Sequence, residues 1–175
     1  MSGKSGSAVK EMDGNVVAYR ALAEADAPAV SRLIIDSFTE FIAPEYSEEG
    51  RAEFIRYVQP EALVDRSRSN HLLLVARAAN TVVGVIELRN NDHVSLLFVD
   101  RAFQQHGIAR TLLRRALSAA RPAIPDLERV TVNSSRFGVP IYERLGFCQT
   151  GPERSVNGIV FIPMAHQLAP DPTSA

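Results

Sequence analysis

Apolar residues recur along the chain with two spacings, one typical of helices and the other typical of strands. Between Val30 and Phe41 they return every three or four residues, which places them on one side of a helix. Pro44 ends this helix, and Ser47, followed by two glutamates, opens a second amphipathic helix that stops at Pro60. We expect a short third segment to follow.

Strand patterns occupy the middle of the chain. Runs rich in Val, Leu and Ile cover residues 71–76, 82–88 and 94–99. The segments between them, Ala79-Asn80 and Asn90-Asn91-Asp92, have the composition of hairpin turns. Strands joined by such short turns lie antiparallel, so these three runs predict an antiparallel meander.

The last third of the chain alternates between the two patterns. The predicted elements are helix 108–120, strand 127–132, helix 139–145, strand 147–150 and strand 159–168. Gly146 closes the short helix, and Asn157-Gly158 turns the final hairpin. With a first strand at 16–20, the predicted order is β-α-α-β-β-β-α-β-α-β-β. The predicted fold class is mixed α/β with a partly antiparallel sheet.

We expect a single domain over residues 15–169. Residues 1–14 contain almost no apolar side chains, and residues 170–175 are equally poor in them. Such segments bury too little surface to offset the entropy of ordering, so both are expected to be tails. No internal repeat or linker divides the region between them.

Composition narrows the class of protein. At 175 residues and 46% hydrophobic content, the chain suits one domain with a full core. Its formal net charge of -1 does not favour nucleic acid or a membrane as partner. The single Cys148 can form no internal disulfide and has no neighbours for a metal cluster. We expect no metal, a core position for Cys148 and a cytoplasmic protein without a signal peptide.

The segment 94–110 carries the most informative chemical pattern. A strand is followed by a short loop and then by Gln104-x-x-Gly107-x-Ala109 at the start of a long helix. A helix N-terminus presents unpaired backbone N–H groups and a partial positive charge, which together bind anions. The small residues let an anion approach that backbone. A glycine before a helix is more often a tight turn, but in this context the pattern predicts a diphosphate site.

This arrangement resembles the coenzyme A signature of the GNAT N-acetyltransferase superfamily, written Q/R-x-x-G-x-G/A. Asn133 ends the next strand, and the segment VPIYERLGF at 139–147 is similar to the closing helix of that family. The order of helices and strands is also similar, so the resemblance covers residues 16–168. It implies an acetyl-CoA-dependent N-acetyltransferase with a GNAT fold, in which the central parallel strands 94–99 and 127–132 splay apart.

The resemblance also implies where the cosubstrate acetyl-CoA binds. Its pantetheine arm would lie between the splayed strands and pair with the main chain of the first one, where a backbone N–H would also hold the thioester oxygen. The diphosphate would rest on backbone N–H groups at the start of the helix. The expected cofactor-binding residues are Leu97, Phe98, Val99, Gln104, Gln105, His106, Gly107, Ile108, Ala109, Arg110 and Asn133.

Catalysis by direct attack on a thioester requires a neutral amine and a leaving thiolate that is stabilised or protonated. Tyr142 stands where the family's general acid stands, and the resemblance favours that role over the alternative of a tyrosine that packs one helix face. His93 lies where the histone-modifying members have a catalytic Glu, so the sequence departs from their pattern. Glu87 on the preceding strand is an alternative base. Either residue could instead face solvent, and ordered water could replace both.

The acceptor is the part that the sequence defines least. In the family it is shaped by the regions that correspond to residues 38–57 and 151–161. The first region is acidic, with Glu40, Glu45, Glu48 and Glu49. These side chains would favour a cationic amine, but glutamates in a first turn also complement the helix dipole.

Three functions therefore remain open, and a homodimer is open as well. The leading hypothesis is direct acetyl transfer to a primary amine of a small molecule through a ternary complex. The second is a protein lysine or N-terminal acetyltransferase, which would need an open groove for a peptide. The third is a non-catalytic module that senses acetyl-CoA.

Overall fold

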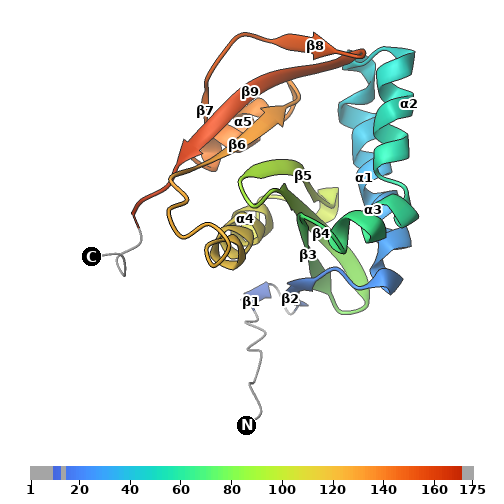
Figure 1. Ribbon diagram of the computed structural model, residues 1–175. Helices are drawn as coiled ribbons and strands as arrows, with labels where there is room; N and C mark the ends of the chain where they lie inside the picture. The colour runs from blue at the N-terminus through green and yellow to red at the C-terminus, as the bar shows by residue number, and fades with distance from the viewer. Residues whose placement is uncertain (1–9, 13–14, 171–175) are drawn as a thin grey trace.

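The computed structural model describes residues 10–12 and 15–170 (Figure 1). The helices are η1 (Glu24–Asp26), α1 (Ala27–Phe41), η2 (Ala43–Glu45), α2 (Glu48–Tyr57), α3 (Pro60–Ser67), η3 (Arg101–Phe103), α4 (Ile108–Ala120) and α5 (Val139–Arg144). The strands are β1 (Lys10–Met12), β2 (Asn15–Ala21), β3 (His71–Ala78), β4 (Thr81–Arg89), β5 (His93–Val99), β6 (Arg129–Ser134), β7 (Cys148–Gln149), β8 (Arg154–Val156) and β9 (Ile159–Gln167). The order of the predicted elements is confirmed, with the helix α3 at the expected short third segment and two short strands, β1 and β8, added to it.

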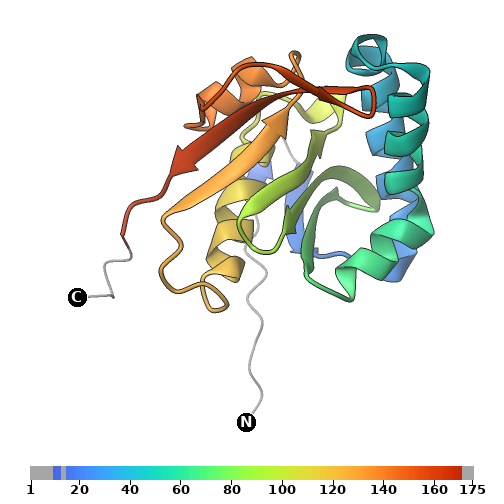
Figure 2. The same ribbon diagram turned by 45° about the horizontal axis from the view of Figure 1, so that its top comes forward.

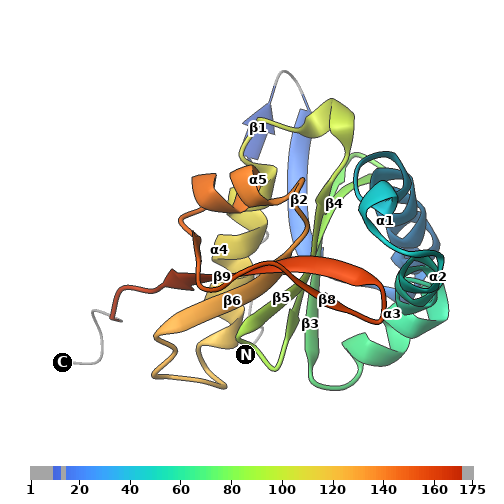
Figure 3. The same cartoon turned by 90° about the horizontal axis from the view of Figure 1, so that it is seen from above.

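The strands form one mixed sheet. Their order is β1-β2-β3-β4-β5-β6-β9-β7, and β8 pairs with β9 beside this path. The predicted meander β3-β4-β5 is antiparallel as expected, and β5 with β6 is the parallel pair. Seen from above, α1, α2 and α3 cover one face of the sheet, while α4 and α5 lie on the other (Figure 3).

Each face has its own hydrophobic cluster. On one face Ile108 and Leu112 of α4 pack with residues of the sheet and of α5. On the other, Val30 and Ile34 of α1 pack with Leu63 of α3 and with the opposite sides of β3 and β4. Full burial stabilises each such side chain by about 1.5–3 kcal/mol, so the two clusters hold the helices against the sheet.

Local sequence explains where the helices near the site begin. The Ser47 hydroxyl accepts a hydrogen bond of 3.1 Å from the backbone N–H of Gly50, which caps α2. Pro28, Pro60 and Pro140 occupy first-turn positions, where a missing N–H costs nothing. Pro60, which was expected to stop α2, also starts α3.

The ends of the chain and one cysteine differ from expectation. Residues 10–12, placed in an expected tail, pair with β2, whereas residues 1–9, 13–14 and 171–175 of the expected tails lie outside the described residues. Cys148, expected in the core, is exposed. It lies on the two-residue strand β7, the last strand of the sheet order, and β7 pairs with β9 alone among the described strands.

Candidate active site

A bulge in β5 opens the centre of the sheet. The parallel pairing of β5 with β6 stops after Val94, which lies opposite Val132. On its other side β5 pairs with β4, where Val94 faces Leu88 and Leu96 faces Glu87. The residue between them is therefore an extra residue, a β-bulge, which bends the strand at the point where it leaves β6. The expected splay of the two strands is confirmed, and this bulge is its local cause.

Beyond the bulge, part of the β5 main chain faces the gap. The backbone N–H of Asp100 donates to the carbonyl of Val83 on β4 at 2.8 Å. Backbone groups alternate in direction along a strand, so Phe98 also turns its main chain toward β4, and Leu97 and Val99 turn theirs toward β6. The carbonyl of Val99 accepts a hydrogen bond of 3.1 Å from the Gln104 side chain. The N–H groups of Leu97 and Val99 are therefore the ones placed to meet an extended ligand in the gap.

A cavity of about 820 Å³ occupies this gap and reaches both faces of the sheet. One part of its wall comes from the start of α4 and from α5, and another comes from the end of α1, from Ile42 and Tyr46 on either side of η2, and from α2. Among the expected site residues, its lining contains Leu97, Phe98, Val99, Gln104, Gln105, Gly107, Ile108, Ala109, Arg110, Asn133 and Tyr142. His106 is exposed beside these residues and is not part of the lining.

The start of α4 has the geometry of an anion site. Gly107 caps the helix in the left-handed conformation, with a φ of 78°, and Gln105 has a φ of 64°. From Gln105 to Arg110, no backbone N–H donates a hydrogen bond to another described residue. Arg110 also places its guanidinium at the end of α5, where it donates to the carbonyl of Arg144 at 2.6 Å. Unpaired N–H groups beside a cation fit a diphosphate.

Tyr142 brings a phenol to the cavity from α5. Its side chain is 9% exposed, and its ring meets that of Phe147 edge to face at 5.3 Å. The Tyr142 hydroxyl forms no hydrogen bond with another described residue, so it is available to a ligand. Burial raises the pKa of Tyr142 well above its ordinary value, which keeps the phenol protonated.

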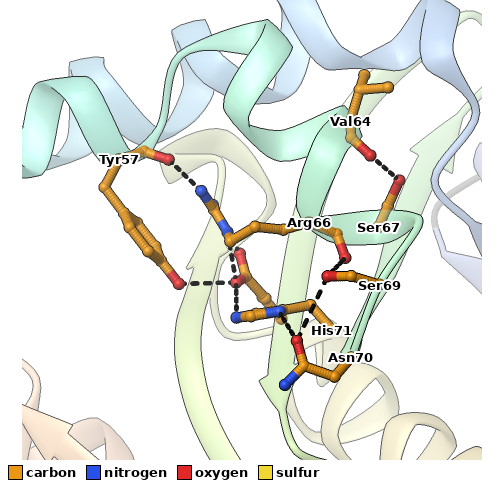
Figure 4. A network of polar contacts seen from close by, with 8 residues as sticks. Tyr57, Val64, Arg66, Ser67, Ser69, Asn70 and His71 are labelled. Atoms are coloured by element: carbon orange, nitrogen blue, oxygen red, sulfur yellow. Dashed lines mark hydrogen bonds and ion pairs between the residues drawn. The ribbon is translucent and has the colours of Figure 1, made fainter.

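Glu87, one of the two expected bases, is directed away from the cavity. Its carboxylate is fully buried and receives two hydrogen bonds from Arg66, at 2.9 and 3.0 Å, and one from the Tyr57 hydroxyl at 2.8 Å. His71 lies 3.5 Å from the same carboxylate, and Figure 4 shows Tyr57, Arg66 and His71 converging on one point. Burial and the nearby Glu87 raise the pKa of Tyr57 to about 12. Glu87 is thus the centre of an ion-pair network behind the site.

His93, the other expected base, lies at the closed end of the β5–β6 pair. It faces Thr131 on β6, and its Nδ1 is 2.8 Å from the Thr131 hydroxyl oxygen. The ring does not line the cavity. Burial lowers the pKa of His93, so the imidazole is neutral near pH 7. The structure therefore brings Tyr142 to the cavity but neither of the two bases.

Contacts between distant segments lie beside the cavity on the side of α1 and α2. The backbone N–H of Ser47 donates to the carbonyl of Gly158 at 3.0 Å, so the β8–β9 turn lies against the start of α2 (Figure 1 and Figure 2). A Cβ atom on Gly50 would come within 2.4 Å of the same carbonyl. Phe41 of α1 stacks on Phe137, which precedes α5, with ring centroids 4.6 Å apart.

Arg136, beside Phe137, adds a polar connection on this side. Its backbone N–H donates to Glu45 at 3.2 Å, and its Nε donates to Glu153 at 2.7 Å. The arginine thus links η2 to the segment before β8. This link lies at the end of the cavity that faces α2, beside the ring stack of Phe41 and Phe137.

Two features of the cavity were missed in the sequence. The first is Ser95, the bulge residue, which lines the cavity and whose buried hydroxyl lies beside that of Tyr57. A serine inside the apolar run 94–99 was the signal for it. The second is a group of five aromatic side chains from separate elements, which only the fold brings together.

The described residues contain no group of His, Cys, Asp or Glu side chains able to hold a metal ion. No helix within the described part of the chain is long and apolar enough to cross a membrane.

A splayed mixed sheet, unpaired N–H groups at a helix start and a phenol in the gap together define the site of an acyl-CoA-dependent transferase. The model of the acetyltransferase (GNAT) domain family matches residues 42–168, and the chain belongs to this family. The protein is therefore an acetyltransferase, and its cosubstrate is acetyl-CoA.

Solved structures share the fold. A GCN5-related N-acetyltransferase from Rhodopseudomonas palustris is 21% identical, with a TM-score of 0.71 over 86% of this chain and 94% of that one. The PaiA N-acetyltransferase of Thermoplasma acidophilum, solved in complex with coenzyme A, is 23% identical, with a TM-score of 0.69 over 87% and 99% of the two chains. A chimeric spermidine N-acetyltransferase from Vibrio cholerae is 21% identical, with a TM-score of 0.58 over 86% and 95%.

Proposed function

We propose that the protein transfers the acetyl group of acetyl-CoA directly to a primary amine of a small molecule, within a ternary complex. The observation that carries the small-molecule assignment is the set of contacts at the cavity end opposite the α4 start, namely the β8–β9 turn against α2, the ring stack and the Arg136 link. A peptide substrate needs an unobstructed groove, and these contacts across that end favour a compact ligand. The spermidine N-acetyltransferase with the same fold is consistent with an amine acceptor.

In the proposed complex, the diphosphate of acetyl-CoA rests on the N–H groups from Gln105 to Arg110, and pantetheine extends along β5 beside Asn133. The N–H of Leu97 or Val99 donates to the thioester oxygen and stabilises the charge that develops there. Phe98 contributes its side chain to the cavity wall instead of its main chain. The side chain of Gln104 holds the loop through Val99 and leaves the phosphate contacts to the backbone.

Tyr142 acts as the general acid. The amine nitrogen attacks the carbonyl carbon, the carbon–sulfur bond breaks, and the phenol gives its proton to the leaving sulfur. The proton released from the new amide nitrogen returns to the phenolate, directly or through water, so the enzyme is unchanged at the end. The high pKa of Tyr142 keeps this proton in place until the thiolate charge develops.

We assign neither His93 nor Glu87 as the direct base. No carboxylate and no imidazole of the described residues lines the cavity. Burial and the arginine side chains around the cavity disfavour an ammonium ion, so the acceptor reacts as the neutral amine after losing its proton to water. The pH dependence should then follow the acceptor rather than an enzyme base.

The test is a screen of primary amines with acetyl-CoA, read out as free thiol and followed by initial rates at varied concentrations of both substrates. A ternary complex gives intersecting double-reciprocal lines, whereas a covalent enzyme intermediate gives parallel ones. Faster turnover of lysine peptides than of every small amine would favour the protein acetyltransferase. Binding of acetyl-CoA without thiol release from any acceptor would favour the sensor.

A further inference from the structure

Aromatic side chains line the end of the cavity that faces α1 and α2. Phe41 and Phe137 stack with their rings 9° from parallel. The ring of Phe54 lies 6.3 Å from that of Phe98 and 6.5 Å from that of Tyr46. We call these five residues the aromatic wall. Phe41 lies on α1, Tyr46 follows η2, Phe54 lies on α2, Phe98 on β5, and Phe137 precedes α5. All five line the same cavity.

The charged side chains in the cavity lining are arginines, namely Arg110, Arg136 and Arg144. Arg136 is paired with Glu153, which lies outside the lining. The glutamates of segment 40–49 do not line the cavity either. Glu40 pairs with Arg101 at 2.7 Å, and Glu45 accepts the backbone N–H of Arg136. Burial, with Glu45 nearby, raises the pKa of Tyr46 to about 12, so its hydroxyl is neutral.

These surroundings discriminate between classes of amine. A polyamine or an aminoglycoside carries several positive charges, and each would leave water without meeting a carboxylate in the cavity. A flat apolar group would instead lose its contact with water and gain contacts with several rings. The observed lining therefore favours an apolar acceptor over the cationic one that the acidic segment 40–49 left open.

We propose that the acceptor is a monoamine whose non-reacting part is an aromatic or similarly flat apolar group, and that this group packs against the aromatic wall. The inference rests on the proposed function, because it names the class of amine that receives the acetyl group.

The experiment compares binding of arylalkylamines and polycations to the protein saturated with coenzyme A, which permits binding without turnover. Titration calorimetry with 2-phenylethylamine and tryptamine should give dissociation constants at least about tenfold lower than with spermidine or kanamycin. Phe137→Ala removes one half of the ring stack and should weaken arylalkylamine binding at least about fivefold. Its matched control is Phe161→Ala, because Phe161 is a partly buried residue of β9 outside the cavity. This variant should leave the affinities for 2-phenylethylamine and tryptamine unchanged.

The outcomes separate this inference from the proposed function. Tighter binding of spermidine or kanamycin, absent binding of both arylalkylamines, or unchanged binding by a folded Phe137→Ala variant would each overturn the aromatic acceptor. Turnover of spermidine alone would do the same while leaving the acetyltransferase assignment to small amines intact. Binding of 2-phenylethylamine without acetyl transfer to any amine would support the subsite and contradict the proposed reaction.

Discussion

Replacing Tyr142 by Phe removes one hydroxyl from the cavity and leaves the ring in place. The hydroxyl has no hydrogen bond to another described residue, and the ring contact with Phe147 at 5.3 Å involves only carbon atoms. The variant therefore loses less free energy of unfolding than the roughly 1 kcal/mol of a typical hydrogen bond. Acetyl-CoA affinity should also be unchanged, because the anion site uses the backbone of α4.

The rate should respond very differently from the stability. General-acid assistance is typically worth about 10²–10⁴ in rate. At about 1.4 kcal/mol per tenfold, its loss raises the barrier by roughly 3–5 kcal/mol. The fall should appear in kcat, since the phenol acts on the leaving sulfur and not on the bound ground state. The assay is single-turnover thiol release with saturating acetyl-CoA and an acceptor from the amine screen.

A matched control is Tyr19→Phe, which removes a buried hydroxyl on β2 outside the cavity. This variant should keep the wild-type rate. The general-acid role of Tyr142 is refuted if Tyr142→Phe releases thiol as fast as the wild type under conditions where chemistry limits the rate. Tyr142 would then be a packing residue, and the thiolate would leave unprotonated.

Further predictions concern the anion site, the pantetheine gap, the network and acid stability. Gly107→Val forces a branched residue into φ of 78°, at a cost of roughly 1–2 kcal/mol or more, and should weaken acetyl-CoA binding at least about tenfold by calorimetry. Coenzyme A at 100 times its Kd should stabilise the fold by about 2.7 kcal/mol in thermal unfolding, and adenosine by much less. Glu87→Leu should leave Arg66 uncompensated and lower the free energy of unfolding by about 3–5 kcal/mol in urea, without changing the pH dependence of kcat/KM. Burial lowers the pKa of His93 in the folded protein, so the unfolded chain binds a proton at a higher pH than the folded protein does. The free energy of unfolding should therefore decline below about pH 6.5, and less steeply in His93→Gln.

Local patterns were enough to predict most of the fold. The spacing of apolar residues in α1 and α4 and the turns of the β3-β4-β5 meander depend on neighbours in the chain, so periodicity identified them. The strands β1 and β8 were missed because each has only three residues and forms by pairing with a longer strand. Such pairing is a long-range event that a local pattern does not report.

The candidate site was likewise predictable only where it is built from neighbouring residues of the chain. Gly107 and the start of α4 were predictable because an anion site of this kind is built from consecutive residues. The direction of Glu87 was not, since β4 is buried on both faces, so its pattern does not tell one side of the sheet from the other, and Arg66 comes from a distant helix. His93 was placed by counting along a strand, which gives its distance from the loop but not its distance from the cavity.

Direct transfer to an amine is tested most directly by mass spectrometry of the protein and the small molecules in one reaction. The protein is first mixed with acetyl-CoA alone and then with an acceptor amine from the screen. Direct transfer predicts that the protein is unmodified before and after the amine is added. It also predicts that the acetylated amine forms at the same rate as free coenzyme A. An acetyl group on the protein that moves to the amine, or release of coenzyme A with acetate as the only product, would contradict it.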